Sequence, residues 1–173
     1  RTAVQLGSPA RIGTTAPGRS GGESCHAEAR RARSNASRQG EITEANKQIG
    51  EMFIQSYMLS NPRAKQAASG LVYNEILIGG GKQARPGNTV TAHYTGSLPD
   101  GTVFDSSKER GQPIEISLGS VIKGWQEGIP FMAEGGIAEL ICPPDIAYGE
   151  RGSPPVIPPH ATLKFEIELI KVH

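Results

Sequence analysis

The chain has 173 residues, of which 36% are hydrophobic, and this is enough for one domain with a modest core. No stretch approaches the roughly 18 apolar residues that a membrane-spanning helix needs, so no membrane span is expected. The net charge of +1 hides an asymmetry, because residues 1–40 carry seven Arg and two Glu while the remainder has a net charge of −4. A mildly acidic folded part argues against a nucleic-acid-binding protein.

Residues 1–40 are rich in Ala, Arg, Ser and Gly and contain almost no bulky apolar side chains. Such a segment buries too little surface to offset the entropy of ordering, so we expect a disordered basic arm. We expect a soluble protein, and the sequence leaves its compartment open between periplasmic, secreted and organellar after N-terminal processing. Cys25 lies in the arm, whereas Cys142 lies in an apolar run, where we expect a buried thiol rather than a disulfide.

Residues 41–61 are predicted to form an amphipathic helix that ends at Asn61–Pro62, and residues 62–69 a linker. The apolar stripe of this helix needs a partner. Packing on the chain's own domain and contact with a second copy or a larger assembly are both open. The stripe follows the 3,4-type spacing of one helix face and contains Ile42, Ala45, Ile49, Met52, Phe53 and Ser56.

From Gly70 onward the hydrophobic period changes to two. In "TVTAHYTG", Val90, Ala92 and Tyr94 alternate with polar residues, which predicts a strand of an antiparallel sheet with one face in water. The same alternation places Leu163, Phe165, Ile167 and Leu169 on one face of a last strand. The segment "VIKGWQEGIPFM" predicts a short helix that covers the sheet. Residues 70–173 therefore predict an α+β domain, a curved sheet wrapped on one short helix with a pocket between them.

The stretch "HYTGSLPDGTVFDSSKERG" combines His93, Asp105, Ser106 and Ser107, the residue types of a nucleophilic hydrolase. No serine lies in a G-x-S-x-G turn, so we interpret "DSS" as a turn whose side chains bond local backbone. The "GGGK" at residues 79–82 lacks the spacing of a phosphate-binding loop. The four histidines are scattered, and neither a metal nor a cofactor is expected.

Four segments, "AHYTGSLPDGTVFDSS", "VIKGWQEGI", "PPDIAYGERG" and "IPPHATLKFEIELIKV", resemble the FKBP family of peptidyl-prolyl cis-trans isomerases over residues 70–172. The resemblance implies a five- or six-stranded antiparallel half-barrel around a short helix. It also implies that the partners are proline-containing polypeptides and the macrolides tacrolimus and rapamycin. The helix followed by "ASGLVYNEI" is similar to members of the macrophage infectivity potentiator type, in which a helical N-terminal region dimerises.

The resemblance also implies a site. Trp125 would form its floor, and Asp105 and Tyr148 would act in catalysis together with the aromatic walls. Ile114 and Ile116 stand at the rim where relatives often place aromatic residues, and the loop Gly119–Val121 is short, which leaves macrolide affinity open. The catalytic residues would be Asp105, Tyr94, Tyr148, Phe104 and Trp125, and the ligand-binding residues Tyr94, Phe104, Asp105, Arg110, Val121, Ile122, Trp125, Tyr148, Ile157 and Phe165.

The leading functional hypothesis is a folding catalyst that acts on X–Pro bonds without a covalent intermediate. The alternative is a non-enzymatic or additional role as a binding module or assembly subunit, attached through residues 1–40 and the helix over residues 41–61.

Overall fold

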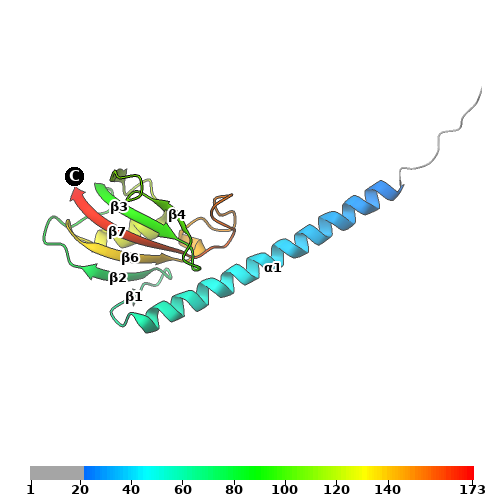
Figure 1. Cartoon of the computed structure of the whole chain (residues 1–173), viewed down its shortest axis with the longest axis horizontal. Helices are drawn as coiled ribbons and strands as arrows, with labels where there is room; N and C mark the ends of the chain where they lie inside the picture. Colours follow the sequence, from blue (N-terminus) through cyan, green and yellow to red (C-terminus); the bar gives the residue numbers. More distant parts are fainter. Residues whose placement is uncertain (1–21) are drawn as a thin grey trace, which may run out of the picture. The chain divides into compact units, whose positions relative to one another are not determined.

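The computed structural model of the chain describes residues 22–173 (Figure 1), and residues 1–21 of the predicted arm lie outside this range. Residues Gln39–His173 form one compact unit, and the described residues before Gln39 are not part of it. Among the described residues, no helix combines the length and the apolar character that crossing a bilayer requires.

Helix α1 spans Gly22–Ser60, so it begins well before residue 41 and residues 22–40 are helical rather than disordered. This segment contains Ala, Arg, Glu and Gln, which have high intrinsic helix propensity. The expectation of disorder relied on the lack of apolar residues alone, and helix propensity was the competing factor. After Ser60 the chain turns at Asn61–Pro62, since proline disfavours helical backbone in the residue before it.

The remaining elements form one antiparallel sheet and a short helix. The strands are β1 (Lys65–Gln66), β2 (Val72–Leu77), β3 (Thr89–Ser97), β4 (Val103–Ser106), β5 (Ile114–Ser117), β6 (Ile137–Cys142) and β7 (Leu163–Val172). Their order is β1-β2-β6-β7-β3-β4, with β5 also paired to β3. Helix α2 (Lys123–Gly128) continues into the 3-10 turn η1 (Ile129–Phe131), and a second turn, η2, covers Pro144–Ile146. The predicted α+β half-barrel is confirmed, with the two-residue β1 as an additional seventh strand.

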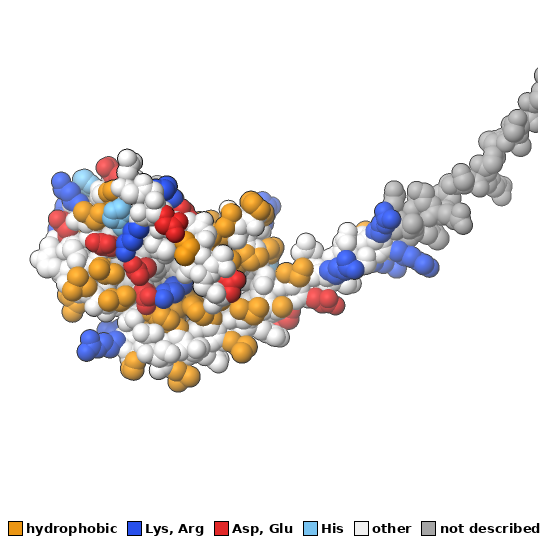
Figure 2. All heavy atoms as spheres, in the orientation of Figure 1, with side chains coloured by type: hydrophobic (Ala, Val, Ile, Leu, Met, Phe, Trp, Pro, Cys, Tyr) orange, Lys and Arg blue, Asp and Glu red, His pale blue; other side chains and the backbone are white. Residues whose placement is uncertain are grey.

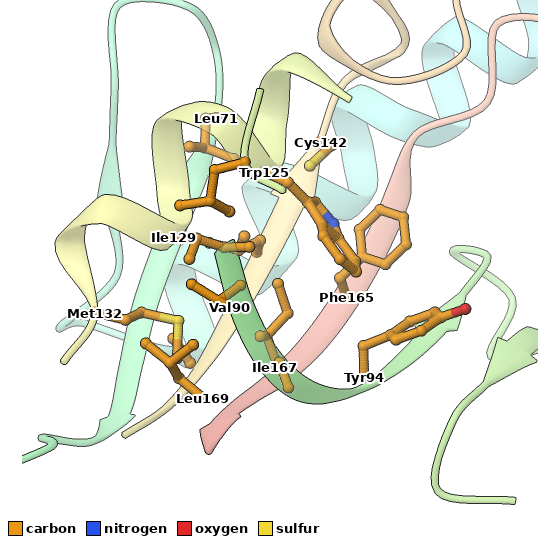
Figure 3. Close-up of a cluster of buried hydrophobic side chains, with 14 of the residues drawn as sticks. Leu71, Val90, Tyr94, Trp125, Ile129, Met132, Cys142, Phe165, Ile167 and Leu169 are labelled. Carbon is orange, nitrogen blue, oxygen red and sulfur yellow. The ribbon is translucent and has the colours of Figure 1, made fainter. Parts of the chain in front are cut away.

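The core lies between the sheet and α2 (Figure 3). The inward residues of β3 and β7 are buried as the alternation predicted, with Val90 and Ile167 both at 0% exposure. Two glycines allow α2 to approach β6 closely. A Cβ at Gly128 would lie 2.7 Å from Leu140 Cδ2, and one at Gly124 would collide with the Cys142 thiol. Burial raises the pKa of Cys142 to about 12, so this residue is a buried apolar group, as expected.

Helix α1 packs on β2 and β6 through a different face from the predicted one. The residues of α1 in this contact are Phe53, Ile54, Tyr57 and Met58, and Gly50 lies against Thr162, just before β7. The predicted stripe is exposed instead, except for the half-buried Phe53. The reason is steric and polar. Gly50 leaves room for Thr162, which any larger residue would clash with, and one hydroxyl of the helix enters a buried hydrogen-bond network.

That hydroxyl belongs to Tyr57 and donates to the carboxylate of Glu139 on β6. Asn74 Nδ2 donates to the same hydroxyl at 2.9 Å, and Lys164 Nζ lies 2.6 Å from Glu139 Oε1. Burial raises the pKa of Tyr57, with the Glu139 hydrogen bond adding to the effect. Burial alone would raise the pKa of Glu139, but its bonds to Lys164 and Tyr57 hold it below the ordinary value. The network fixes the C-terminal part of α1 to the sheet.

Candidate active site

A hollow of about 340 Å³ opens between the sheet and α2. Strands β3, β4, β5 and β7, helix α2 and the loops before α2 and after η2 all contribute to it. Its lining residues are Tyr94, Phe104, Asp105, Ile114, Ile116, Ser120, Val121, Ile122, Trp125, Tyr148 and Phe165. Because most of these side chains are apolar or aromatic, the hollow suits a compact apolar ligand such as a proline ring.

Aromatic rings meet edge to face at the base of this pocket. Trp125 on α2 lies 5.2 Å from the ring of Tyr94 and 5.2 Å from that of Phe165, centroid to centroid. Phe104 meets Phe165 at 5.7 Å and 89°. Edge-to-face pairs of this kind are mutually stabilising and hold each ring in a fixed orientation. Tyr94, Trp125 and Phe165 are at most 9% exposed, so the base of the pocket is preformed.

Space for these rings depends on Gly96 of β3. A Cβ at this position would lie 2.5 Å from Phe104 Cζ and 3.0 Å from Phe165 Cε1. Gly96 was not among the predicted site residues. The available signal was a glycine inside a strand pattern, which often marks close approach of another group.

One charged group stands at the edge of the pocket. The carboxylate of Asp105 accepts hydrogen bonds from the Tyr94 hydroxyl and from Arg110 Nη1. Arg110 Nη2 also donates to the Tyr94 hydroxyl at 3.1 Å, and the guanidinium lies 5.7 Å from the centre of the Tyr94 ring. The three side chains therefore form a closed ring of interactions, and Asp105 cannot turn without breaking two hydrogen bonds.

The same contacts set the protonation of the site. Burial alone would raise the pKa of Asp105, but the hydrogen bonds from Tyr94 and Arg110 outweigh it and hold the pKa below its ordinary value. Burial, and then the hydrogen bond to Asp105, raise the pKa of Tyr94. Burial also raises the pKa of Tyr148, and the charge of Asp105 adds to the shift. At neutral pH, Asp105 is a carboxylate and both tyrosines are hydrogen-bond donors.

The histidine and serines next to Asp105 have structural contacts. Ser107 Oγ accepts from the Tyr94 backbone N–H at 2.8 Å and lies 3.0 Å from His93 Nδ1. Ser106 Oγ accepts from the backbone N–H of Glu109 at 3.3 Å. The bonds of Ser107 join β3 to the turn after β4. The interpretation of "DSS" as a turn is wrong for Asp105 and Ser106, which lie in β4 because they pair with β3. No group of three or more potential metal ligands occurs in the part of the chain that the structure describes.

All the predicted binding residues except Arg110 and Ile157 line the pocket. Arg110 contacts it indirectly, through Asp105 and Tyr94. Ile157 lies in the core, with 4% exposure, and its N–H donates to Ser153 O at 2.9 Å within the loop. It supports the loop after Tyr148 and does not line the pocket. Ser120 also lines the pocket and was not predicted. The only signal for it in the sequence was its position directly before Val121.

Residues 80–170 match the family model described as FKBP-type peptidyl-prolyl cis-trans isomerase. The chain belongs to this family. Its sequence is 53% identical to "FK506-binding protein 1" of Rhizopus delemar over 107 residues, which is 60% of this chain and 99% of that protein. FKBP-type members catalyse cis–trans isomerisation of peptide bonds that precede proline, and this chain is accordingly a peptidyl-prolyl isomerase.

Two solved FKBP-type structures share the fold. The crystal structure of FkpA from Escherichia coli has a TM-score of 0.79 and 35% identity, over 87% of this chain and 70% of that one. A peptidyl-prolyl cis-trans isomerase from Pseudomonas syringae has a TM-score of 0.69 and 37% identity, over 75% of this chain and 95% of that one. Coverage of 87% exceeds the isomerase domain alone, so the likeness to FkpA extends to α1.

Proposed function

We propose that the aromatic pocket accelerates isomerisation by binding the X–Pro bond more tightly when it is twisted than when it is planar. The observation that carries this proposal is the preformed cup of Tyr94, Phe104, Trp125 and Phe165 next to the fixed carboxylate of Asp105. Twisting removes amide resonance and makes the bond less polar at oxygen, so an apolar cup favours the twisted form over the planar form. No covalent bond breaks, and the reaction needs no nucleophile.

The catalytic effect required is moderate. The uncatalysed bond rotates over a barrier of about 18–20 kcal/mol and takes tens to hundreds of seconds. Shortening about 100 s to about 10 ms requires roughly 5.5 kcal/mol of additional transition-state stabilisation. Several aromatic contacts and one or two hydrogen bonds that strengthen as the bond twists are enough for this.

Each pocket residue has a role in this proposal. Trp125 is the floor on which the proline ring rests, and Phe104 and Phe165 are walls. The Tyr148 hydroxyl, on a residue that is 40% exposed at the pocket, donates a hydrogen bond to the bound peptide. Asp105 acts as a positioning residue that holds Tyr94 and Arg110 and orients the local dipoles toward the twisting bond.

We also propose that the pocket binds tacrolimus and rapamycin. The chain is 53% identical to a relative named FK506-binding protein 1, and Ile114 and Ile116 give the pocket an aliphatic rim. Trp125 is the only tryptophan of the chain, so its fluorescence reports directly on the pocket floor.

A fluorescence titration of the full chain with tacrolimus, alongside a proline isomerisation assay in the same samples, tests the site. We expect saturable quenching and loss of isomerase activity at the same stoichiometry. Quenching without inhibition, or inhibition without quenching, would show that the pocket around Trp125 is not the catalytic site.

A second role concerns the exposed side of α1. Its exposed large residues are Ile42 (48%), Ile49 (52%) and Met52 (69%) of the predicted stripe, and Leu59 (85%), which continues the stripe toward the end of the helix. They repeat at alternating spacings of three and four residues together with Ala45 and Ser56, and this is the repeat of a two-helix seam. Flanking Gln48 and Gln55 are neutral, so two identical helices would not repel each other there. We propose that this seam binds the same helix of a second copy.

Light scattering after size exclusion tests the seam. The full chain should be a dimer, and Ile49→Glu with Met52→Glu should make it a monomer, since a charge at two seam positions disrupts the pairing. Lys47→Glu, on the opposite side of the helix, is the matched control and should remain a dimer. A monomeric full chain would refute the pairing.

A further inference from the structure

Strand β2 has an open edge. On one side it pairs with β6 along the range Val72–Leu77, but on the other side β1 pairs only with Val72 and Tyr73. Within residues 22–173, no strand therefore pairs with the outer edge of β2 over residues 74–77 (Figure 1). An unpaired strand edge presents free N–H and C=O groups and is a template for another extended chain.

Apolar side chains gather beside this edge. Exposure reaches 55% for Ile76, 51% for Leu77, 78% for Ile78 and 55% for Phe131 of η1. Figure 2 shows hydrophobic side chains at the surface over the region where β2 lies in Figure 1. Neighbouring exposed apolar side chains of this size mark an interaction site more often than isolated ones do.

The edge also borders a groove, which we name the β2 groove. It consists of one hollow of about 520 Å³ and an adjoining one of about 350 Å³. The two hollows share Lys65, Tyr73 and Glu75. The first also has Arg63, Ile76, Leu77 and Ile78 in its lining, and the second has Gln66, Ala67, Leu71 and Phe131.

The β2 groove carries a surplus of positive charge. The Tyr73 hydroxyl is buried, and burial and the charge of Glu75 raise its pKa to about 12. Arg63 and Lys65 take part in none of the ion pairs found among residues 22–173. Against the single carboxylate of Glu75, the groove therefore carries a net positive charge.

We propose that the β2 groove binds an extended segment of an unfolded polypeptide, which adds as a strand to the open edge of β2. Alternate apolar side chains of the segment contact Leu77, Ile78 and Phe131. A carboxylate of the segment lies against Arg63 and Lys65. The segment needs no proline.

The position of the groove connects it to catalysis. The stretch that supplies Val121, Ile122 and Trp125 to the catalytic pocket continues through α2 to Phe131 in the groove. A client chain held in the groove would present its prolines to the pocket at a raised effective concentration. The pairing that the open edge of β2 offers to a bound segment is short, because a β-bulge shifts the register of β2 between Glu75 and Leu77. Short pairing favours transient binding, as a folding catalyst requires.

Fluorescence anisotropy of a labelled, proline-free peptide of alternating valine and aspartate tests the proposal on the full chain. We expect saturable binding that weakens at least about tenfold in a Leu77→Glu, Ile78→Glu variant. Ile170→Glu, a matched change at a residue of β7 that is 40% exposed, should bind as the wild type does. Isomerase activity on a short proline peptide should be the same in all three proteins, which separates failure of the groove from failure of the catalytic site.

Hydrogen exchange locates the peptide. Amides of residues 74–77 should exchange more slowly when the peptide is bound, and tacrolimus should not displace it. Absence of binding, equal binding by the Leu77→Glu, Ile78→Glu variant, or displacement by tacrolimus would each overturn the proposal. So would loss of a dimer in that variant, because a second copy would then be the occupant of the edge.

Discussion

Tyr94 and Asp105 are joined by a hydrogen bond from the tyrosine hydroxyl to the carboxylate, across the pairing of β3 with β4. In that pairing Asp105 stands opposite Gly96, so Tyr94 is its diagonal neighbour on the same face of the sheet. The bond fixes a charged group at the edge of an aromatic pocket, and Arg110 closes the arrangement.

Replacing Asp105 by Asn should lower kcat/KM about five- to tenfold, which corresponds to about 1.0–1.4 kcal/mol of transition-state stabilisation. The amide cannot hold both Tyr94 and Arg110, so the orientation of the site relaxes while the fold persists. A proline isomerisation assay with circular dichroism measures both effects. Asp100→Asn makes the same chemical change in an exposed loop and should be silent. Wild-type rates for Asp105→Asn would remove Asp105 from the mechanism.

The depressed pKa of Asp105 predicts the pH dependence of stability. Its ordinary value is 3.8, and the value in the folded protein lies below this. The unfolded chain therefore takes up the proton first as the pH falls, so the stabilisation by Asp105 is complete above about pH 4 and is lost below it. Urea unfolding should show a constant difference between wild type and Asp105→Asn down to about pH 4, and a shrinking one below. If the difference in free energy of unfolding grew as the pH fell, the pKa of Asp105 would be raised in the folded protein rather than lowered.

The space beside Gly96 predicts a substitution that alters the pocket more than the fold. A methyl group in Gly96→Ala would displace the Phe104 ring, whose far end lies 2.5 Å from the position of the added Cβ. Because Phe104 is only half-buried, the ring can move into the pocket. We expect loss of tacrolimus binding and of most isomerase activity with little change in stability. Gly80→Ala has no neighbour within 4 Å and is the control.

Two Tyr→Phe substitutions should have opposite effects. Tyr57→Phe removes the donor to Glu139 in a buried network and should lower the free energy of unfolding by about 1–3 kcal/mol without changing kcat/KM. Tyr148→Phe removes the hydroxyl of a residue that is 40% exposed at the pocket, and should lower kcat/KM a few-fold, with stability within about 0.5 kcal/mol. Thermal unfolding and isomerisation assays on both proteins check the pair. The reverse pattern would mean that these roles are exchanged.

The sheet and its site could be predicted because their signals are local and repeated. Alternation along β3 and β7 identified the buried face, including Tyr94 and Phe165, and the motif around Trp125 identified the short helix. Ile157 shows the limit of motif matching. Its position in the motif predicts a place in the pocket, but in the structure it is buried and is not among the residues that line the pocket.

The orientation of α1 could not be predicted, because both faces of the helix carry apolar residues. Hydrophobicity favours the face of Ile42, Ile49 and Met52. The sheet selects the other face through the small size of Gly50 and the hydrogen bond of Tyr57 to Glu139. Both contacts join residues that are distant in the sequence. Gly50 and Thr162 are 112 positions apart, and Tyr57 and Glu139 are 82 positions apart. Contacts at such separations leave no periodic signal in the sequence.

The most direct test of the central claim compares two phenylalanines by exchange NMR spectroscopy on a short proline peptide. Phe104 is a wall of the pocket, and Phe131 lies outside it. The aromatic-cup mechanism predicts that Phe104→Ala lowers catalysed cis–trans exchange at least about tenfold, while Phe131→Ala retains the wild-type rate. Equal rates for Phe104→Ala and the wild type would show that the aromatic cup is not the source of catalysis.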